Sequence, residues 1–215
     1  MQTPLNLVVL ISGNGSNLQA LIDAQATSNY RVVKVVSNRP DAYGLKRAQQ
    51  HGIATETIDH QNFPDRESFE QALIKAIDPA QPGLVVLAGF MRILTPAFTG
   101  HYLGKMLNIH PSLLPKYPGL HTHKRALESG DTEHGLSIHF VTDELDGGPV
   151  ILQAKTPVSA NDTEASLKQK IHELEHQAYP KAVELFACGK IHFADHQAWW
   201  LDQRLTTPLQ LEDLN

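Results

Sequence analysis

The chain has 215 residues, of which 41% are apolar and 19% charged, so a packed core is expected and wholesale disorder is not. Its 18 Lys and Arg against 23 Asp and Glu leave a net charge of −5, and no basic block marks a nucleic-acid binder. The single cysteine, Cys188, excludes an intrachain disulfide and a Cys-based zinc site. No basic residue precedes the first apolar run, 5–11, which is too short to span a bilayer; we therefore expect a cytoplasmic protein.

Short apolar runs alternate with longer amphipathic segments from the first residues onward. This alternation, with strands that are continuously apolar, predicts an α/β fold: an open, mostly parallel, twisted sheet with helices on both faces. The expected strands cover 5–11, 32–36, 55–58, 84–88 and 106–109, and the expected helices cover 18–26, 42–50 and 65–77.

The pattern changes after residue 134. Two expected strands, 135–141 and 149–154, are joined by a connection too short for a helical crossover, which predicts an antiparallel pair in the C-terminal half. A long helix is expected over 163–188, broken or kinked at Pro180, before a final strand and tail. Because no linker is visible, we expect one domain over 1–202, with halves of about 1–104 and 105–202, and a tail at 203–215.

The segment 12–17 (SGNGSN) lies between the first expected strand and the first helix. Glycines there let a phosphate approach the N–H groups at the helix N-terminus. Leu18 stands where the dinucleotide fingerprint has its third glycine, so a mononucleotide or sugar phosphate is favoured over NAD. An ordinary turn with a Ser or Asn cap is the alternative.

The segment 108–115 (NIHPSLLP) places two polar side chains at the end of an expected strand. Asn108 and His110 project to the same side because side chains alternate along a strand, and open α/β sheets bind ligands at this end. An amide and an imidazole can both stabilise an oxyanion, which suits acyl transfer. The alternative is a capping Asn and a solvated His.

The segment 143–148 (DELDGG) joins the two late strands, where acidic, glycine-ended connections are usually plain turns. An Asp from this connection, if it lay beside His110, would favour the charged imidazolium. The sequence leaves open whether the two residues meet.

The segment 172–176 (HELEH) matches the H-E-x-x-H zinc-protease pattern on an expected helix. Tyr179 stands where the longer metzincin pattern requires glycine, and Glu184 is too near to be an obvious third ligand. Twelve histidines in a chain of this length produce such pairs readily. A zinc protease is therefore not favoured.

Together with the segment 88–94 (AGFMRIL), these motifs closely resemble the glycinamide ribonucleotide formyltransferase family, folate-dependent enzymes of purine biosynthesis. The resemblance runs from the first strand to about residue 202, with the motifs in the family's order. It implies a Rossmann-like formyltransferase domain, with a mononucleotide-binding first half and a folate-binding, catalytic second half.

The resemblance also implies roles for particular residues. Asn108, His110 and Asp146 align with the catalytic trio. Gly15, Ser16 and Asn17 align with the loop that holds the ribonucleotide phosphate, and Glu175 with a carboxylate that contacts this substrate. The implied folate pocket comprises Arg66, Met91, Arg92, Ile93, Leu94, Asn108, Thr142, Asp143, Glu144, Leu145 and Asp146. The family's Glu-His pair is here Glu175 and His176, so His172 and Glu173 lie outside the pattern.

The implied reaction transfers the formyl group of 10-formyltetrahydrofolate to the amine of glycinamide ribonucleotide. The folate is a co-substrate consumed in each turnover, so no tightly bound cofactor and no metal are expected. Both implied partners are small molecules; no nucleic-acid or membrane partner is expected, and a homodimer stays open.

Four alternatives are weighed against this interpretation. Methionyl-tRNA formyltransferase carries a further C-terminal domain for tRNA, and formyltetrahydrofolate deformylase carries an extra N-terminal domain. A sugar-phosphate-binding module would need only 12–17 and would have no use for Asn108, His110 and Asp146 together. A zinc hydrolase would need bound metal.

Overall fold

The computed structural model describes residues 3–214 and divides into two compact units, one up to Asn108 and one from Ile109 onward. The first two residues and Asn215, which the sequence interpretation assigned to the domain and the tail, lie outside the described residues.

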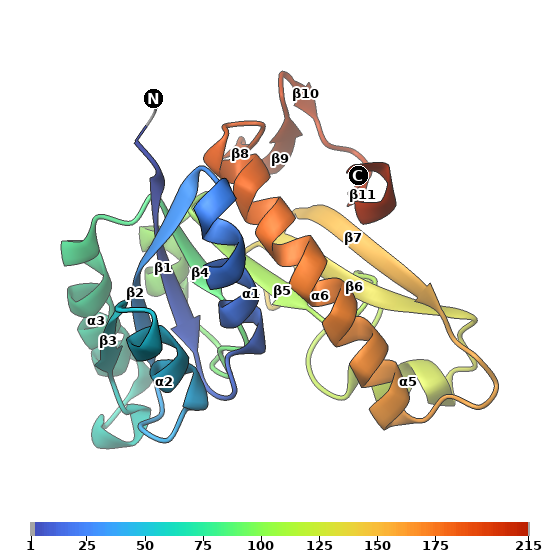
Figure 1. The fold of residues 1–215 in the computed structure, drawn as a ribbon, viewed down its shortest axis with the longest axis horizontal. Helices are drawn as coiled ribbons and strands as arrows, with labels where there is room; N and C mark the ends of the chain where they lie inside the picture. Colours follow the sequence, from blue (N-terminus) through green and yellow to red (C-terminus); the bar gives the residue numbers. More distant parts are fainter. Residues whose placement is uncertain (1–2, 215) are drawn as a thin grey trace. The chain divides into compact units, whose positions relative to one another are not determined.

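The first unit contains a sheet of parallel strands in the order β3-β2-β1-β4-β5 (Figure 1). In β1 every side chain from Leu7 to Ile11 is fully buried, as expected for a central strand covered on both faces. The mostly parallel α/β sheet predicted from the sequence is confirmed. The strands are β1 (Leu5–Ile11), β2 (Tyr30–Ser37), β3 (Ala54–Thr57), β4 (Leu84–Leu87) and β5 (Met106–His110).

Two helices of the first unit, α3 and α4, begin where the sequence supplies N-terminal signals. Asp65 caps α3 by accepting the N–H of Ser68, and Thr95 caps α4 ahead of a proline in its first turn. The short α4 was not predicted. The helices are α1 (Ser16–Ala24), α2 (Tyr43–Gln50), α3 (Arg66–Ile77) and α4 (Pro96–His101), with 3₁₀ turns at Gln25–Thr27, His60–Asn62 and Asp78–Ala80.

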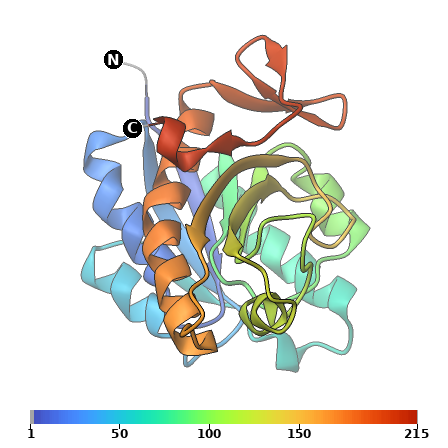
Figure 2. The same ribbon diagram turned by 90° about the vertical axis from the view of Figure 1, so that its right-hand side faces the viewer.

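The second unit contains the predicted antiparallel pair, β6 (Glu133–Phe140) and β7 (Val150–Pro157). Its long helix α6 (Glu164–Ala187) packs along this pair (Figure 2). The unpredicted α5 (Thr122–Glu128) precedes β6. The last strands are β8 (Ile191–Ala194), β9 (Gln197–Trp200), β10 (Gln203–Arg204) and β11 (Leu209–Gln210), followed by a 3₁₀ turn at Leu211–Leu214.

Two expectations for the C-terminal part were wrong. Pro180 does not break the long helix, because α6 continues through it with Pro180 buried. A helix loses one hydrogen bond at such a proline, and packing on β6 and β7 offsets that loss. The expected single late strand is instead an antiparallel sheet of β8, β9 and β10, and β11 pairs in parallel with β7.

Candidate active site

In the first unit, the strand order reverses between β1 and β4, where the chain connections leave toward opposite edges. Open α/β sheets bind ligands outside the carboxyl ends of the strands at such a point. The glycine loop, residues 12–17, follows β1. The segment 91–94, which the resemblance predicts to bind folate and which is called the folate segment below, comes just after β4. The fold therefore places two of the predicted ligand segments at the carboxyl ends of adjacent strands.

The glycine loop enters α1 through Gly15, whose φ of 75° is in the left-handed region. A Cβ on Gly15 would lie 2.7 Å from Cα of Gly44, so the loop packs against the backbone of α2. No side chain caps α1 and its first turn holds no acidic residue. The positive end of the helix dipole is therefore not offset by a carboxylate, as an anion site requires.

Arg47, on α2, is a residue of this region that the sequence interpretation missed. Its Nε donates to the carbonyl of Asn14 at 2.9 Å, and Nη2 donates to Oδ1 of the same residue at 3.0 Å. The Arg47 guanidinium carbon lies 4.9 Å from the ring centre of Tyr43. A fixed positive charge thus lies beside the glycine loop. Arg47 and the loop 12–17 are too far apart in the sequence for a local pattern to indicate this contact.

The folate segment 91–94 has no regular secondary structure and is held at both ends by side chains. Ser12 accepts the N–H of Met91 at 2.8 Å, and Glu70 accepts the N–H of Thr95 at 2.9 Å. Met91 and Ile93 are 68% and 55% exposed, an apolar surface on which a flat ring can pack.

Two further predicted folate residues of the first unit are arginines, Arg92 in this segment and Arg66 at the start of α3. Nε of Arg92 is buried and has no hydrogen-bond partner among the described residues. Arg66 is exposed at the start of α3, four residues before Glu70, so the two lie on the same side of the helix.

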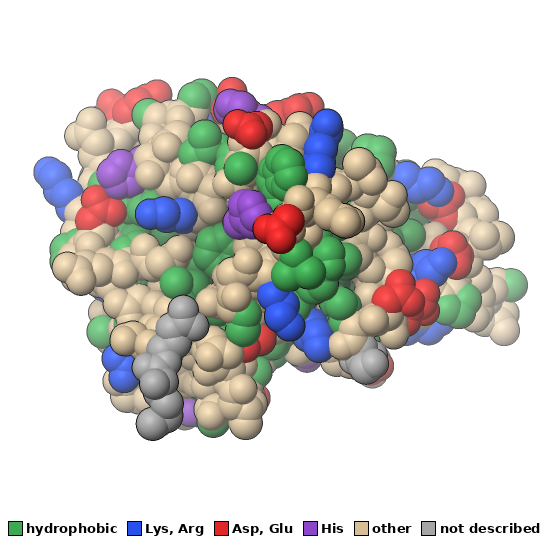
Figure 3. All heavy atoms as spheres, turned by 90° about the horizontal axis from the view of Figure 1, so that it is seen from above, with side chains coloured by type: hydrophobic (Ala, Val, Ile, Leu, Met, Phe, Trp, Pro, Cys, Tyr) green, Lys and Arg blue, Asp and Glu red, His purple; other side chains and the backbone are tan. Residues whose placement is uncertain are grey.

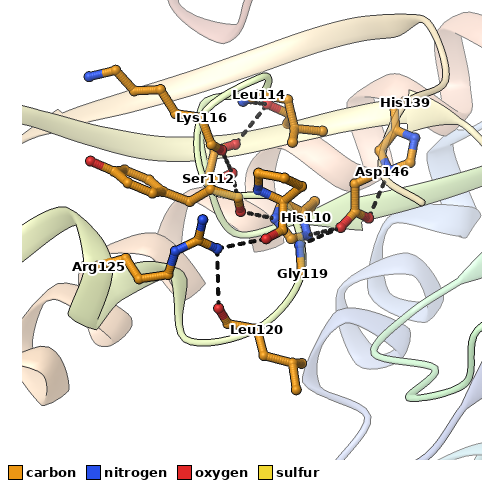
Figure 4. Close-up of polar contacts among 12 residues, drawn as sticks. His110, Ser112, Leu114, Lys116, Gly119, Leu120, Arg125, His139 and Asp146 are labelled. Atoms are coloured by element: carbon orange, nitrogen blue, oxygen red, sulfur yellow. Dashed lines mark hydrogen bonds and ion pairs between the residues drawn. The ribbon is translucent and has the colours of Figure 1, made fainter. Parts of the chain in front are cut away.

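In the second unit, His110 and Asp146 meet, as the resemblance implied (Figure 4). Nδ1 of His110 lies 3.4 Å from Oδ2 of Asp146, and Nε2 donates to the carbonyl of Tyr117 at 2.9 Å. Both side chains are nearly buried, at 7% and 8% exposed. Both ring nitrogens of His110 therefore face hydrogen-bond acceptors, which fixes the orientation of the ring.

Asp146 is itself held from two sides. Its Oδ2 accepts the N–H of Gly119 at 2.8 Å, and its Oδ1 lies 3.7 Å from Nε2 of His139. Burial lowers the pKa of His139 below its ordinary value, and Nδ1 of that ring is placed to donate to the carbonyl of Phe140. His139 is therefore neutral near pH 7, which leaves the carboxylate charge to pair with His110. Neither Tyr117, Gly119 nor His139 was singled out from the sequence.

The connection that carries Asp146 is shaped by its glycines. A Cβ on Gly148 would collide with the carbonyl oxygen of Phe140, so only glycine fits there. Asp146 has a φ of 52°, a left-handed conformation that Asp adopts more readily than most residues. The other predicted folate residues of the connection, Thr142, Asp143, Glu144 and Leu145, are half-buried or exposed.

The last two predicted residues are positioned by regular elements. Asn108 is in β5 two residues before His110, so the two side chains leave the strand on the same side. Glu175 is in α6 and is 5% exposed, and its negative charge adds to burial in raising the pKa of Tyr179 well above its usual range.

The histidines of the zinc-protease pattern lie on α6 and contact each other and Glu175. The rings of His172 and His176 stack with centres 6.3 Å apart, and Nε2 of His172 lies 4.0 Å from a Glu175 oxygen. Across residues 3–214, no group of three or more His, Cys, Asp or Glu side chains is arranged to hold a metal ion.

Charges of both signs are interspersed over the molecular face drawn in Figure 3, without a continuous basic patch. Among the helices that the structure describes, none has the length and apolar character needed to cross a bilayer.

The model of the formyl transferase family matches residues 5–183 of the chain. Phosphoribosylglycinamide formyltransferase of Escherichia coli K12 is 58% identical over 203 residues, which cover 94% of this chain and 96% of that protein. The enzyme of the same name from Haemophilus influenzae is 44% identical over 195 residues, covering 90% of this chain and 92% of that protein.

A solved structure gives the same result at the level of the fold. Phosphoribosylglycinamide formyltransferase from Coxiella burnetii superimposes with a TM-score of 0.93 at 52% sequence identity. The match covers 96% of this chain and 99% of that one.

Proposed function

Since the chain belongs to the formyl transferase family, we propose that it transfers the formyl group of 10-formyltetrahydrofolate to the amine of glycinamide ribonucleotide, a step of purine biosynthesis. The products are formylglycinamide ribonucleotide and tetrahydrofolate. The observation that carries the proposal is the buried His110–Asp146 pair at the end of β5, two residues after Asn108.

The proposed chemistry uses Asn108, His110 and Asp146. The substrate amine attacks the formyl carbon, a new C–N bond forms, and an oxyanion develops. The Asn108 amide and the Nε2–H of His110 stabilise that charge, with the oxyanion replacing the Tyr117 carbonyl as acceptor. Asp146 lies beside Nδ1 and orients the ring. The old C–N bond breaks as a proton passes from the attacking amine to the folate nitrogen, through His110, Asp146 or a water.

The binding residues are assigned from the family resemblance. Gly15, Ser16 and Asn17 present N–H groups of the uncapped α1 terminus to the ribonucleotide phosphate. Glu175 contacts the same substrate from α6. The folate lies against Arg66, the segment 91–94, Asn108 and the connection 142–146.

The reaction also defines the chain's partners. Both substrates are small molecules, the folate is a consumed co-substrate, and neither a resident metal nor a tightly bound cofactor is required, because donor side chains supply the electrophilic assistance. We place the enzyme in the cytoplasm, with no nucleic-acid or membrane partner.

The glycine loop gives a test that separates a phosphate site from a plain turn. Gly15→Ala should weaken ribonucleotide binding by about tenfold or more, because the new Cβ pushes the loop off α2. Folate binding should change less than about twofold. Binding titrations with each ligand, run beside a melting curve, measure this.

Gly52→Ala is the matched control, because Gly52 also has a positive φ, 67°, but nothing lies within 4 Å of its added Cβ. It should lower the melting temperature through backbone strain and leave both affinities unchanged. If Gly15→Ala weakens both ligands equally, in step with its melting temperature, the loop is only a turn.

A further inference from the structure

A line of buried hydrogen bonds crosses the first unit at the carboxyl ends of its strands. The Ser12 hydroxyl, just after β1, donates to Oδ1 of Asn38, just after β2, at 2.6 Å. The oxygen of the Ser12 hydroxyl in turn accepts the N–H of Met91 at 2.8 Å. Ser12 and Asn38 are 7% and 2% exposed.

The line continues to β3 through the other end of the Asn38 side chain. Nδ1 of His60 lies 3.3 Å from Nδ2 of Asn38 and 3.0 Å from the Asn38 carbonyl oxygen. It accepts from Nδ2 when it is unprotonated and donates to the carbonyl when it carries a proton, so one of the two hydrogen bonds forms in each tautomer. Either one ties Asn38 to the turn after β3, while Oδ1 of Asn38 accepts from Ser12.

One hydroxyl therefore serves two segments with different proposed ligands. Ser12 is the first residue of the glycine loop 12–17, and Met91 is the first residue of the folate segment 91–94. The folate segment is irregular, and Ser12 provides one of the two side-chain anchors at its ends. Loss of that hydroxyl would release the start of the folate segment and remove a contact that orients the start of the glycine loop.

We propose that Ser12 and Asn38 are positioning residues shared by the two substrates, which hold the glycine loop and the folate segment in a fixed relation. This inference rests on the proposed function. Neither residue touches the reacting atoms; each acts through the backbone that it holds.

The test is steady-state kinetics with both substrates varied. Ser12→Ala should raise KM for the ribonucleotide and for the folate together, each about three- to tenfold, with kcat changed less than about twofold. Ser12→Thr keeps the hydroxyl and should return both KM values to within about threefold of the wild type.

Ser37→Ala is the matched control. Ser37 is likewise buried, and its hydroxyl also makes two hydrogen bonds, but both go to the backbone of Arg39. This variant should lose a similar amount of thermal stability and leave both KM values unchanged. A merely structural role for Ser12 would make the two variants alike.

Asn38→Ala is a second test, because it leaves the Ser12 hydroxyl in place but removes the side-chain oxygen that accepts its hydrogen bond. It too should raise both KM values, and combining it with Ser12→Ala should add little, since the two residues act through one contact. A rise confined to one substrate, or additive effects, would overturn the inference. A wild type that transfers no formyl group would refute the proposed function instead.

Discussion

His110 is the residue whose surroundings are most specific in the second unit. Its two ring nitrogens face a carboxylate and a carbonyl, and the neighbouring His139 is kept neutral by burial. An acyl-transfer site needs a hydrogen-bond donor held in a fixed orientation beside the developing oxyanion, and these contacts fix the orientation of the His110 ring.

Asp146→Asn tests that arrangement. The amide keeps the size of the side chain but removes the charge that pairs with Nδ1, so we expect kcat to fall by about a hundredfold or more. The kcat of Asn108→Ala and that of His110→Ala should fall by at least as much. The absorbance change on tetrahydrofolate formation measures all three. Glu128→Gln, an exposed carboxylate on α5, is the control and should keep the wild-type rate; an active Asp146→Asn would remove this residue from the mechanism.

The histidines of α6 give a prediction about metal. We expect exhaustive chelation to leave formyl transfer unchanged, because the proposed donors are side chains of Asn108 and His110. His172→Gln should be nearly silent, whereas Glu175→Ala should raise KM for the ribonucleotide. Metal analysis of the purified protein accompanies the assay. A stoichiometric metal whose removal abolishes activity would contradict this expectation.

The contacts that hold the predicted site residues in place were less predictable from the sequence than the residues that carry the motifs. Asp146 beside His110 followed from the family resemblance, and the residues alone left their contact open. Arg47, Asn38 and the Tyr117 carbonyl were not predicted. Arg47 and Asn38 contact residues that are distant in the sequence, and Tyr117 contributes a backbone atom, so neither periodicity nor a motif indicates these contacts.

At the scale of elements, α5 carries a pH-sensitive contact. Nδ1 of His123 lies 3.1 Å from Nε2 of His134 in β6. Burial, and then the positive charge that His134 can carry, lower the pKa of His123 to about 4 from 6.5. Between these values the unfolded chain binds a proton that the folded chain does not, so the free energy of unfolding falls as pH falls from about 6.5 toward 4.

His123→Gln should therefore shrink the drop in melting temperature between about pH 7 and pH 5, because one such proton no longer distinguishes the two states. Thermal melts of both proteins across that range measure the difference. His176→Gln, which changes an exposed histidine on α6, should leave the wild-type drop in place. An unaltered drop in His123→Gln would mean that this ring titrates alike in both states.

Elements were predictable where local signals agree, and less so where packing decides. The continuous apolar runs located β1, β2, β4 and β5, because strands buried on both faces need no polar alternation. The short α4 and α5 were missed because six or seven residues hold too few turns for a clear period. Pro180 led to the prediction of a break that α6 does not have. The hydrogen bond lost at a proline is a local cost, whereas the packing that stabilises α6 involves residues distant in the sequence.

At the scale of the whole chain, the order of strands decides where chemistry can occur. The predicted parallel α/β sheet places the glycine loop after β1 and the folate segment after β4, at the reversal of strand order. Periodicity gave the strands but not their order, which depends on pairing between distant residues. Family membership then links this arrangement to formyl transfer.

The most direct test of the central claim is the formation of tetrahydrofolate by the purified full chain, followed by absorbance with 10-formyltetrahydrofolate in the presence and absence of glycinamide ribonucleotide. We predict rapid, stoichiometric formation only when the ribonucleotide is present, with the formyl group recovered on its amine. Tetrahydrofolate release at the same rate without the ribonucleotide, with formate as the product, would show a hydrolase and contradict the account.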